Sequence, residues 1–235
     1  MYQDFSGYGL YILISLPALL LGFWAQMKVK TAISKYSKVR SVAGFSGAKV
    51  ARKMLDQNGL NEVQVEQIQG FLSDHYDPRH KVLRLSPQVY QGNSLVSFGV
   101  ASHEAGHAIQ DGKGYLPLKF RTAMVPTVQI GSWLGPIIFF LGLILASSVG
   151  TQMATFGLIL FAATAAFAII TLPVEFNATK RAKKWLISSG TISQQEYKGV
   201  DRVLDAAALT YVAGAVQAIS TILYYAFILF GRRRE

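Results

Sequence analysis

AMVPTVQIGSWLGPIIFFLGLILASSVGTQMATFGLILFAATAAFAIITLPV, residues 123–174, contains no aspartate, glutamate, lysine, arginine or histidine. A helix needs about 20 mostly apolar residues to cross the hydrocarbon core of a bilayer. This stretch is long enough to cross twice, and we expect its turn near 147–152. It therefore predicts two membrane helices, at roughly 123–146 and 153–173.

Two further segments lack charged residues, and each is long enough to cross a membrane once. They lie at roughly 5–27 and 206–230, with the usual error of a few residues at their ends. The first could instead be a cleaved signal peptide. It begins at Asp4 rather than at a basic region and shows no small-residue cleavage site, so we favour a retained anchor. We therefore expect a mainly α membrane protein with about four transmembrane helices.

The basic residues lie beside these segments. The chain has 23 Lys and Arg against 13 Asp and Glu, a net charge of +10. The basic clusters are Lys28, Lys30, Lys35, Lys38 and Arg40, and then Lys180, Arg181, Lys183 and Lys184. By the positive-inside rule, 28–122 and 174–205 face the cytoplasm. Membrane-flanking charge explains the basic balance, so we expect no nucleic-acid partner.

The C-terminal basic tail conflicts with this topology. Four crossings would place Arg232, Arg233 and Arg234 outside the cell. Either the last segment does not cross, or the tail tolerates the violation, and both alternatives stay open. We expect five parts: an N-terminal anchor (1–27), a small cytoplasmic α+β part (28–122), a transmembrane hairpin (123–173), a cytoplasmic helical segment (174–205), and a C-terminal membrane segment with the tail (206–235).

Local signals in the polar part predict two helices and two strands. Ser46 can cap a helix that runs through Leu55 and ends at Asn58-Gly59, and Ser94 can cap one that runs to about Asp111-Gly112. The alternating stretch 62–68 and the stretch 81–86 favour short strands, with a turn at Asp77-Pro78 between them. The second of these strands could offer an edge to which an extended peptide substrate adds, or it could be purely structural.

The chemistry-bearing motif is His103-Glu104-Ala105-Gly106-His107. Residues four apart project from one face of a helix, so both imidazoles can bind one zinc ion. Glu104 can then accept a proton from a water that the metal activates. The alternative is a histidine pair satisfied by hydrogen bonds alone. The apolar neighbours of the motif predict a buried helix, where a metal would supply the partners that polar groups need. The chain has no cysteine, which excludes a thiolate site.

Glu175 is the best candidate for a third zinc ligand. It is the only acidic residue between Asp111 and Glu196, and the membrane hairpin can return it to the side of His107. Alternatively, Glu175 could be an acidic residue at a helix N-terminus, where its negative charge would interact favourably with the helix macrodipole. The motif upstream decides in favour of a ligand.

Three residues after Glu175 are candidates for supporting roles. Thr179 lies four residues on and could orient a ligand, and Asn177 could do the same. Both could equally be ordinary polar residues at the membrane edge. Arg181 could polarise a substrate carbonyl or hold its carboxylate, or it could serve as a topogenic anchor. His75 and His80 could be further ligands, but a solvated turn suits their spacing better.

Four stretches together resemble the YugP-type family of neutral zinc metallopeptidases. They are Asp74-His-Tyr-Asp-Pro-Arg79, Leu83-Arg-Leu-Ser-Pro87, Ser102-His-Glu-Ala-Gly-His-Ala-Ile-Gln-Asp111 and Leu172-Pro-Val-Glu-Phe-Asn-Ala-Thr179. The resemblance covers nearly the whole chain, including 205–212. More distantly, the layout is similar to that of the HtpX-type and CAAX-prenyl-type membrane gluzincins.

The resemblance implies a zincin-like catalytic part with one zinc ion per chain. His103, His107 and Glu175 would be its ligands, and Glu104 the general base. Together with the basic clusters, the uncharged segments predict a multi-pass protein of the prokaryotic plasma membrane, whose catalytic part faces the cytoplasm. The chain departs from related gluzincins at Thr179, where they usually carry an acid, and an acid is also expected at Asn177.

The sequence therefore predicts a zinc endopeptidase that acts on membrane or membrane-adjacent proteins. The alternative is a non-catalytic membrane scaffold or partner-binding protein that retains a structural metal site. An intramembrane site is disfavoured because the apolar run before His103 is too short to span. Uncharged segments also argue against an ion-coupled transporter. Small residues in 162–168 would permit close helix packing, so a homo-oligomer or a membrane partner protein stays open.

Overall fold

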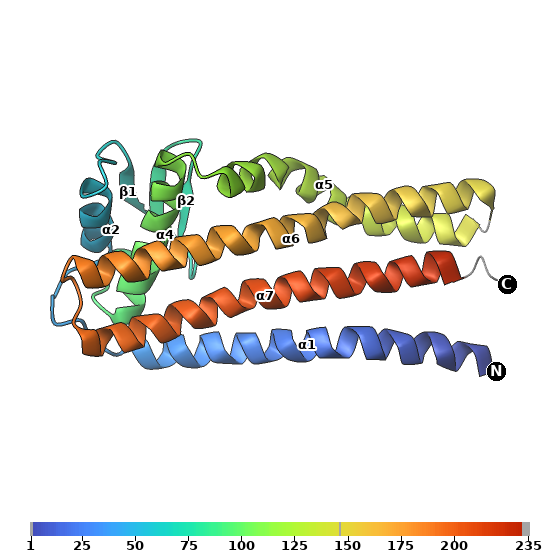
Figure 1. Cartoon of the computed structure of the whole chain (residues 1–235), viewed down its shortest axis with the longest axis horizontal. Helices are drawn as coiled ribbons and strands as arrows, with labels where there is room; N and C mark the ends of the chain where they lie inside the picture. The colour runs from blue at the N-terminus through green and yellow to red at the C-terminus, as the bar shows by residue number, and fades with distance from the viewer. Residues whose placement is uncertain (1, 146, 232–235) are drawn as a thin grey trace. The chain divides into compact units, whose positions relative to one another are not determined.

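The computed structural model describes residues 2–145 and 147–231. It is mainly helical, with one small sheet (Figure 1). In chain order the elements are α1 (Tyr2–Tyr36), α2 (Gly47–Asp56), β1 (Gln64–Gln67), β2 (His75–Asp77), β3 (Val82–Leu85), α3 (Pro87–Tyr90), α4 (Leu95–Gly112), α5 (Leu116–Leu145), α6 (Ser148–Ser188) and α7 (Gln194–Gly231).

The chain divides into two compact units. Unit 1 comprises Met1–Trp24, Phe120–Leu172 and Tyr211–Glu235, and unit 2 comprises Ala25–Lys119 and Pro173–Thr210. Helices α1, α5, α6 and α7 each contribute residues to both units. Each unit has its own hydrophobic cluster.

Four helices are long and apolar enough to cross a membrane, as the uncharged segments predict: α1 from Ile12, α5, α6 and α7. These four helices are longer than the uncharged segments, because each helix continues into a polar stretch that belongs to unit 2. The turn predicted at 147–152 is wrong in extent, since α6 already begins at Ser148. The Gly150 amide donates to Ser147 Oγ at 3.1 Å, and this contact caps the helix. The expected basic tail at 232–235 lies outside the described residues.

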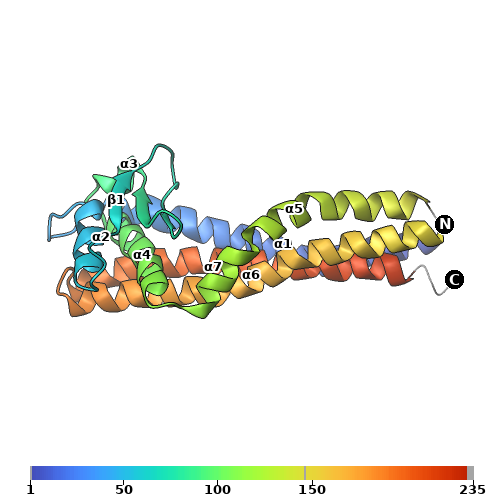
Figure 2. The ribbon, with the colours of Figure 1, turned by 90° about the horizontal axis from the view of Figure 1, so that it is seen from above.

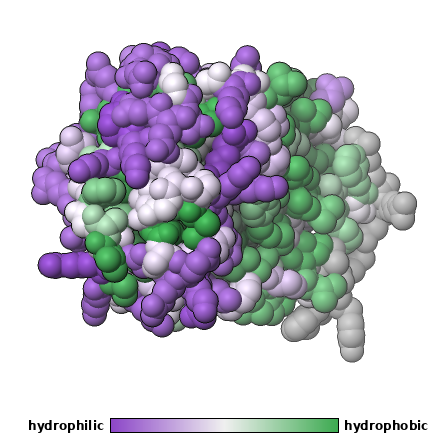
Figure 3. All heavy atoms as spheres, turned by 60° about the vertical axis from the view of Figure 1, so that its left-hand side comes forward, coloured by the Kyte–Doolittle hydropathy of each residue, from purple (hydrophilic) through white to green (hydrophobic). Residues whose placement is uncertain are grey.

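Small residues allow the α5 and α6 segments of unit 1 to pack closely. Gly135 and Gly157 lie against each other's helices, where an added Cβ would meet backbone atoms. Phe139 of α5 is fully buried in a cluster that includes Leu158 of α6 and Leu229 of α7. Large apolar side chains cover the outside of unit 1, whereas polar side chains dominate the face of unit 2 seen in Figure 3.

Unit 2 packs α2, α4 and the sheet around one core. Ser46 caps α2 by accepting from the Lys49 amide, and Gly59 follows this helix with φ +74°, as predicted. The core draws on α2, the sheet, α4, α6 and α7, and includes Met54, Leu83, Phe98 and Leu186. The short helix α3 was not predicted and is labelled in Figure 2.

The sheet order is β1-β3-β2, with β3 parallel to β1 and antiparallel to β2. The prediction that strand 82–86 offers a free edge is therefore wrong, because β3 is paired on both sides. The strand predicted at 62–68 is confirmed but shorter, as Gln64–Gln67.

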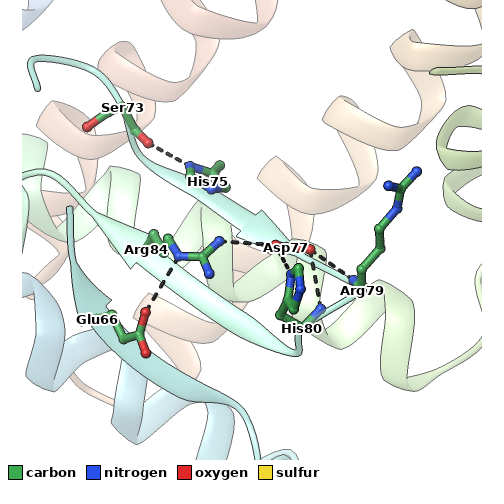
Figure 4. A network of polar contacts seen from close by, with 7 residues as sticks. All are labelled: Glu66, Ser73, His75, Asp77, Arg79, His80 and Arg84. Atoms are coloured by element: carbon green, nitrogen blue, oxygen red, sulfur yellow. Dashed lines mark hydrogen bonds and ion pairs between the residues drawn. The ribbon is translucent and has the colours of Figure 1, made fainter. Parts of the chain in front are cut away.

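Charged side chains hold the sheet together (Figure 4). Asp77 accepts hydrogen bonds from the His80 ring at 2.7 Å and from Arg84 at 3.0 Å, and Arg84 also pairs with Glu66. His75 lies on strand β2 and bonds to the Ser73 carbonyl, so its assignment to a turn was wrong. His80 lies in the exposed turn that follows β2.

Candidate metal centre

Helix α4 presents both motif histidines on one face. Its N-terminus is capped by Ser94, which accepts from the Ser97 amide, and it runs to Gly112 as predicted. Buried residues of this helix include Phe98, Ala101, Ala105 and Ile109, which belong to the core of unit 2. This packing fixes the rotation of the helix. His107 is therefore buried, while His103 and Glu104 remain partly exposed.

Helix α6 brings the third candidate ligand. It continues through Pro173 and ends at Ser188, so Glu175 lies inside a helix and its alternative role at a helix N-terminus is wrong. The side chain of Glu175 is 1% exposed. Helix α4 approaches the backbone of α6 at Gly106, where only a residue without a side chain leaves enough room beside Ala178.

The three side chains converge. The Nε2 atoms of His103 and His107 lie 3.1 Å and 3.4 Å from Glu175 Oε2. The two rings meet edge to face, with centroids 4.8 Å apart. Among the described residues, this is the only group of three or more His, Asp or Glu side chains whose donor atoms could share a metal ion, with all of these atoms within 4.8 Å.

The outer nitrogen of each ring also has a partner. His103 Nδ1 lies 3.2 Å from Thr179 Oγ1, and His107 Nδ1 lies 3.0 Å from Gln110 Oε1. Because both Nδ1 atoms are engaged, the rings are held with their Nε2 atoms directed at Glu175. Metal-binding histidines are commonly oriented in this way.

The remaining two candidates extend this network. Asn177 Oδ1 accepts from Gln110 Nε2 at 3.0 Å and from Arg181 Nε at 2.7 Å. The structure therefore brings Asn177, Thr179 and Arg181 near the cluster, with Thr179 in contact with His103. Gln110 was missed by the sequence reasoning. The available signal was its position three residues after His107, on the same face of α4.

The sheet is tied to the end of α4. Asp111 accepts from the Tyr76 hydroxyl at 2.9 Å and from Lys81 Nζ at 2.7 Å. Burial, followed by the hydrogen bond to Asp111, raises the pKa of Tyr76 above its usual range. Since Asp111 directly follows Gln110, these contacts also hold the end of α4 that carries the metal-centre network.

His75 and His80 do not join the cluster. The Nδ1 atom of His75 contacts the Ser73 carbonyl oxygen, and the Nδ1 atom of His80 contacts the Asp77 carboxylate. The less favoured alternative, that this pair supplies further ligands, is therefore not supported among the described residues.

The donor set suits a zinc ion. Two imidazole nitrogens and one carboxylate from the HExxH…E pattern are the protein ligands of one class of catalytic zinc site, which leaves a further position for water. The buried carboxylate of Glu175 and the oriented rings of His103 and His107 supply all three of these donors.

Two comparisons bear on this geometry. Residues 11–230 match a family model described as "Putative neutral zinc metallopeptidase". The chain is also 46% identical to the "Putative membrane protease YugP" of Bacillus subtilis (strain 168), over 96% of this chain and 99% of that protein. No solved structure matches.

Proposed function

Because the chain belongs to this family of zinc metallopeptidases, we propose that it is a zinc-dependent endopeptidase that hydrolyses membrane or membrane-adjacent proteins. The observation that carries the proposal is the convergence of His103, His107 and Glu175 within 4.8 Å, with Glu104 beside them in sequence. These three side chains would hold one zinc ion.

Each residue would have a separate task. Zinc in such a site acts as a Lewis acid that activates water and polarises a carbonyl. Glu104 would accept the water proton on a carboxylate oxygen and pass it to the leaving amine nitrogen. Thr179 would hold the His103 ring through Nδ1, and Glu175 would place a negative charge among otherwise neutral ligands.

The four long apolar helices support a location in a membrane, and the similarity to a bacterial membrane protease supports the prokaryotic plasma membrane. The basic clusters after the first and third segments support a catalytic part on the cytoplasmic side. That part comprises the proposed regions 28–122 and 174–205, joined by the hairpin at 123–173. A substrate would thus be a protein whose scissile bond is accessible at or near the cytoplasmic surface.

The test uses full-length protein purified in detergent, with zinc content and cleavage of a membrane-protein mixture as readouts. Glu104→Gln is expected to retain about one zinc per chain and to lose proteolysis by about 10²-fold or more. His103→Ala is expected to lose both, and Glu62→Gln, at an exposed position, neither. If Glu104→Gln cleaves as fast as wild type, the mechanism is wrong. Zinc binding without cleavage by wild type would favour the scaffold alternative.

A further inference from the structure

A groove lies beside the first half of α4, and we propose that it binds a stretch of the polypeptide substrate in which an acidic residue adjoins apolar ones. The groove has a volume of about 610 Å³, within the range of ligand sites. It lies wholly in unit 2, between the end of α1, the loop before β2, α3 and the start of α4. The inference rests on the proposed function, because it names the substrate segment that the protease would hold.

Helix α4 connects this groove with the metal centre. Val96 and Val100 of α4 line the groove. Residues four apart lie on one face of a helix, so Glu104 follows Val100 on the same face, about 6 Å further along the axis. An extended peptide advances about 3.3 Å per residue. A peptide whose scissile bond lies at Glu104 would therefore place a residue about two positions away beside Val100.

The positive charges of the groove have no counter-charge within it. Lys38 and Arg40 line the groove, and no aspartate or glutamate does. Neither of the two forms an ion pair with another residue that the structure describes. Asp74 is not part of the lining, and its carboxylate already accepts from the amide and the hydroxyl of Ser86. A carboxylate brought by a ligand would therefore complement the two cations.

The main chain holds Arg40 at the start of α4. The Val39 carbonyl oxygen accepts from the Leu95 amide at 2.9 Å, and the Ser41 amide donates to the Asn93 carbonyl oxygen at 2.8 Å. These bonds on either side of Arg40 form an isolated antiparallel bridge. The guanidinium group is therefore presented to the groove from a fixed backbone position.

An exposed loop supplies the apolar wall of the groove. Phe71 and Leu72 are 70% and 54% exposed, and both line it. Leu72 has a φ of +55°, a left-handed conformation that costs free energy in a leucine. The loop is held at one end by the bond from the Ile68 amide to the Leu85 carbonyl oxygen at 2.8 Å, and at the other by the contacts of Asp74. An apolar side chain of a ligand would shield this wall from water.

A polypeptide suits the groove better than lipid does. Met27 is the last residue of the first uncharged segment, and α1 continues to Tyr36. The stretch 28–36 rises about 14 Å, roughly twice the thickness of the headgroup layer of a bilayer, and the two basic residues of the groove follow it. The side-chain amides of Gln88 and Asn93 also line the groove, where they can hydrogen-bond to a peptide main chain.

The experiment measures peptide binding to full-length, zinc-loaded Glu104→Gln protein in detergent, so that cleavage does not consume the probe. The probes are pools of short fluorescent peptides that combine apolar residues with one glutamate. In matched pools this glutamate is replaced by glutamine or by lysine. Fluorescence anisotropy gives the Kd of each pool, and thermal melting checks that every variant is folded.

Lys38→Gln/Arg40→Gln, added to this protein, tests the charges. Lys30→Gln/Lys35→Gln is the matched control, because it also removes two exposed positive charges but lies outside the lining. We expect the parent and the control to bind the glutamate pool about tenfold more tightly than the glutamine pool. The groove variant should lose this preference. Lys38→Glu/Arg40→Glu should reverse it in favour of the lysine pool.

Phe71→Ala tests the apolar wall. It should weaken the binding of all pools about tenfold, whereas Val42→Ala, which is 90% exposed and outside the lining, should not. Equal preference for glutamate in the groove variant and its control would overturn the inference. So would a Phe71→Ala protein that keeps its peptide affinity but loses a dimer seen by size exclusion, because the groove would then belong to a second copy.

The two proposals fail separately. A wild-type protein without proteolytic activity would refute the proposed function. The peptide measurement does not depend on cleavage, and its repetition without metal would still decide whether the groove takes an acidic and apolar segment.

Discussion

Gly106 of α4 lies directly against the main chain of α6 at Ala178. A Cβ added to Gly106 would come within 2.8 Å of the Ala178 carbonyl oxygen and 3.2 Å of its Cα. Backbone atoms cannot move aside as the end of a flexible side chain can. The contact lies between the two helices that carry the candidate ligands, so their spacing depends on this glycine.

Gly106→Ala is therefore expected to push α4 from α6 and to separate the histidines from Glu175. We expect a loss of about 1–3 kcal/mol in the free energy of unfolding and at least about tenfold weaker zinc binding. Thermal melting and chelator competition measure the two effects. Gly99→Ala is the matched control on the same helix, because its Cβ would meet only side chains at 3.5 Å or more. Equal behaviour of the two variants would contradict the prediction.

Thr179→Val should weaken zinc binding about 10- to 100-fold, because valine keeps the shape of threonine but removes the partner of His103 Nδ1. Thr179→Ser retains the hydroxyl and is expected to stay within a few-fold of wild type. Metal titration of the purified protein checks both variants. If valine binds zinc as tightly as serine, the hydroxyl does not orient the ring.

Asp77 should make unit 2 sensitive to acid. The hydrogen bond from the His80 side chain is the main cause that lowers the pKa of Asp77 well below its usual range, and Arg84 adds to it. A lowered pKa in the folded state stabilises the protein above the unfolded value, near 4. That stability is lost as pH falls from there toward the folded pKa.

Melting curves of wild type and Asp77→Asn between about pH 6 and pH 3 test this dependence. The variant should be less stable at pH 6, and the difference should shrink as pH falls below about 4. Curves that keep a constant separation over this range would show that ionised Asp77 does not stabilise the sheet.

Gly157→Ala should disrupt the close packing of α5 and α6 in unit 1. Its Cβ would meet the Gly135 carbonyl oxygen at 2.7 Å and would come closer still to the Phe139 amide nitrogen. We expect a loss of about 1–3 kcal/mol in detergent-solubilised stability. Gly214→Ala on α7, whose Cβ would have no neighbour within 4 Å, should be nearly neutral. A melting temperature for Gly157→Ala that matches the control would be the contrary result.

Sequence reasoning succeeded where the signal is local. Uncharged runs predict the four long helices because a helix makes all its backbone hydrogen bonds internally. To cross a membrane it then needs only sufficient length and apolar side chains. Serine at positions 46 and 94 gives the starts of α2 and α4 because a cap acts within one turn. The HExxH spacing places His103 and His107 together for the same reason.

It failed where distant segments decide the outcome. The position of β3 in the middle of the sheet depends on pairing with both β1 and β2, which no pattern within 81–86 encodes. The orientation of Gln110 depends on Val174 and Asn177, partners 64 and 67 residues away on another helix. Arg181 was expected to meet substrate or to anchor topology, and its bond to Asn177 four residues earlier on α6 was missed although that signal is local.

His103 and Glu175 are 72 residues apart in the chain, with all of α5 and about two thirds of α6 synthesised between them. A ribosome therefore releases the HExxH helix well before the carboxylate that completes its ligand set exists. During translation the nascent protein holds two imidazoles and a base, but no full coordination sphere. The proposed hydrolytic activity would therefore arise only after the residues of the hairpin and the first two thirds of α6 have been made.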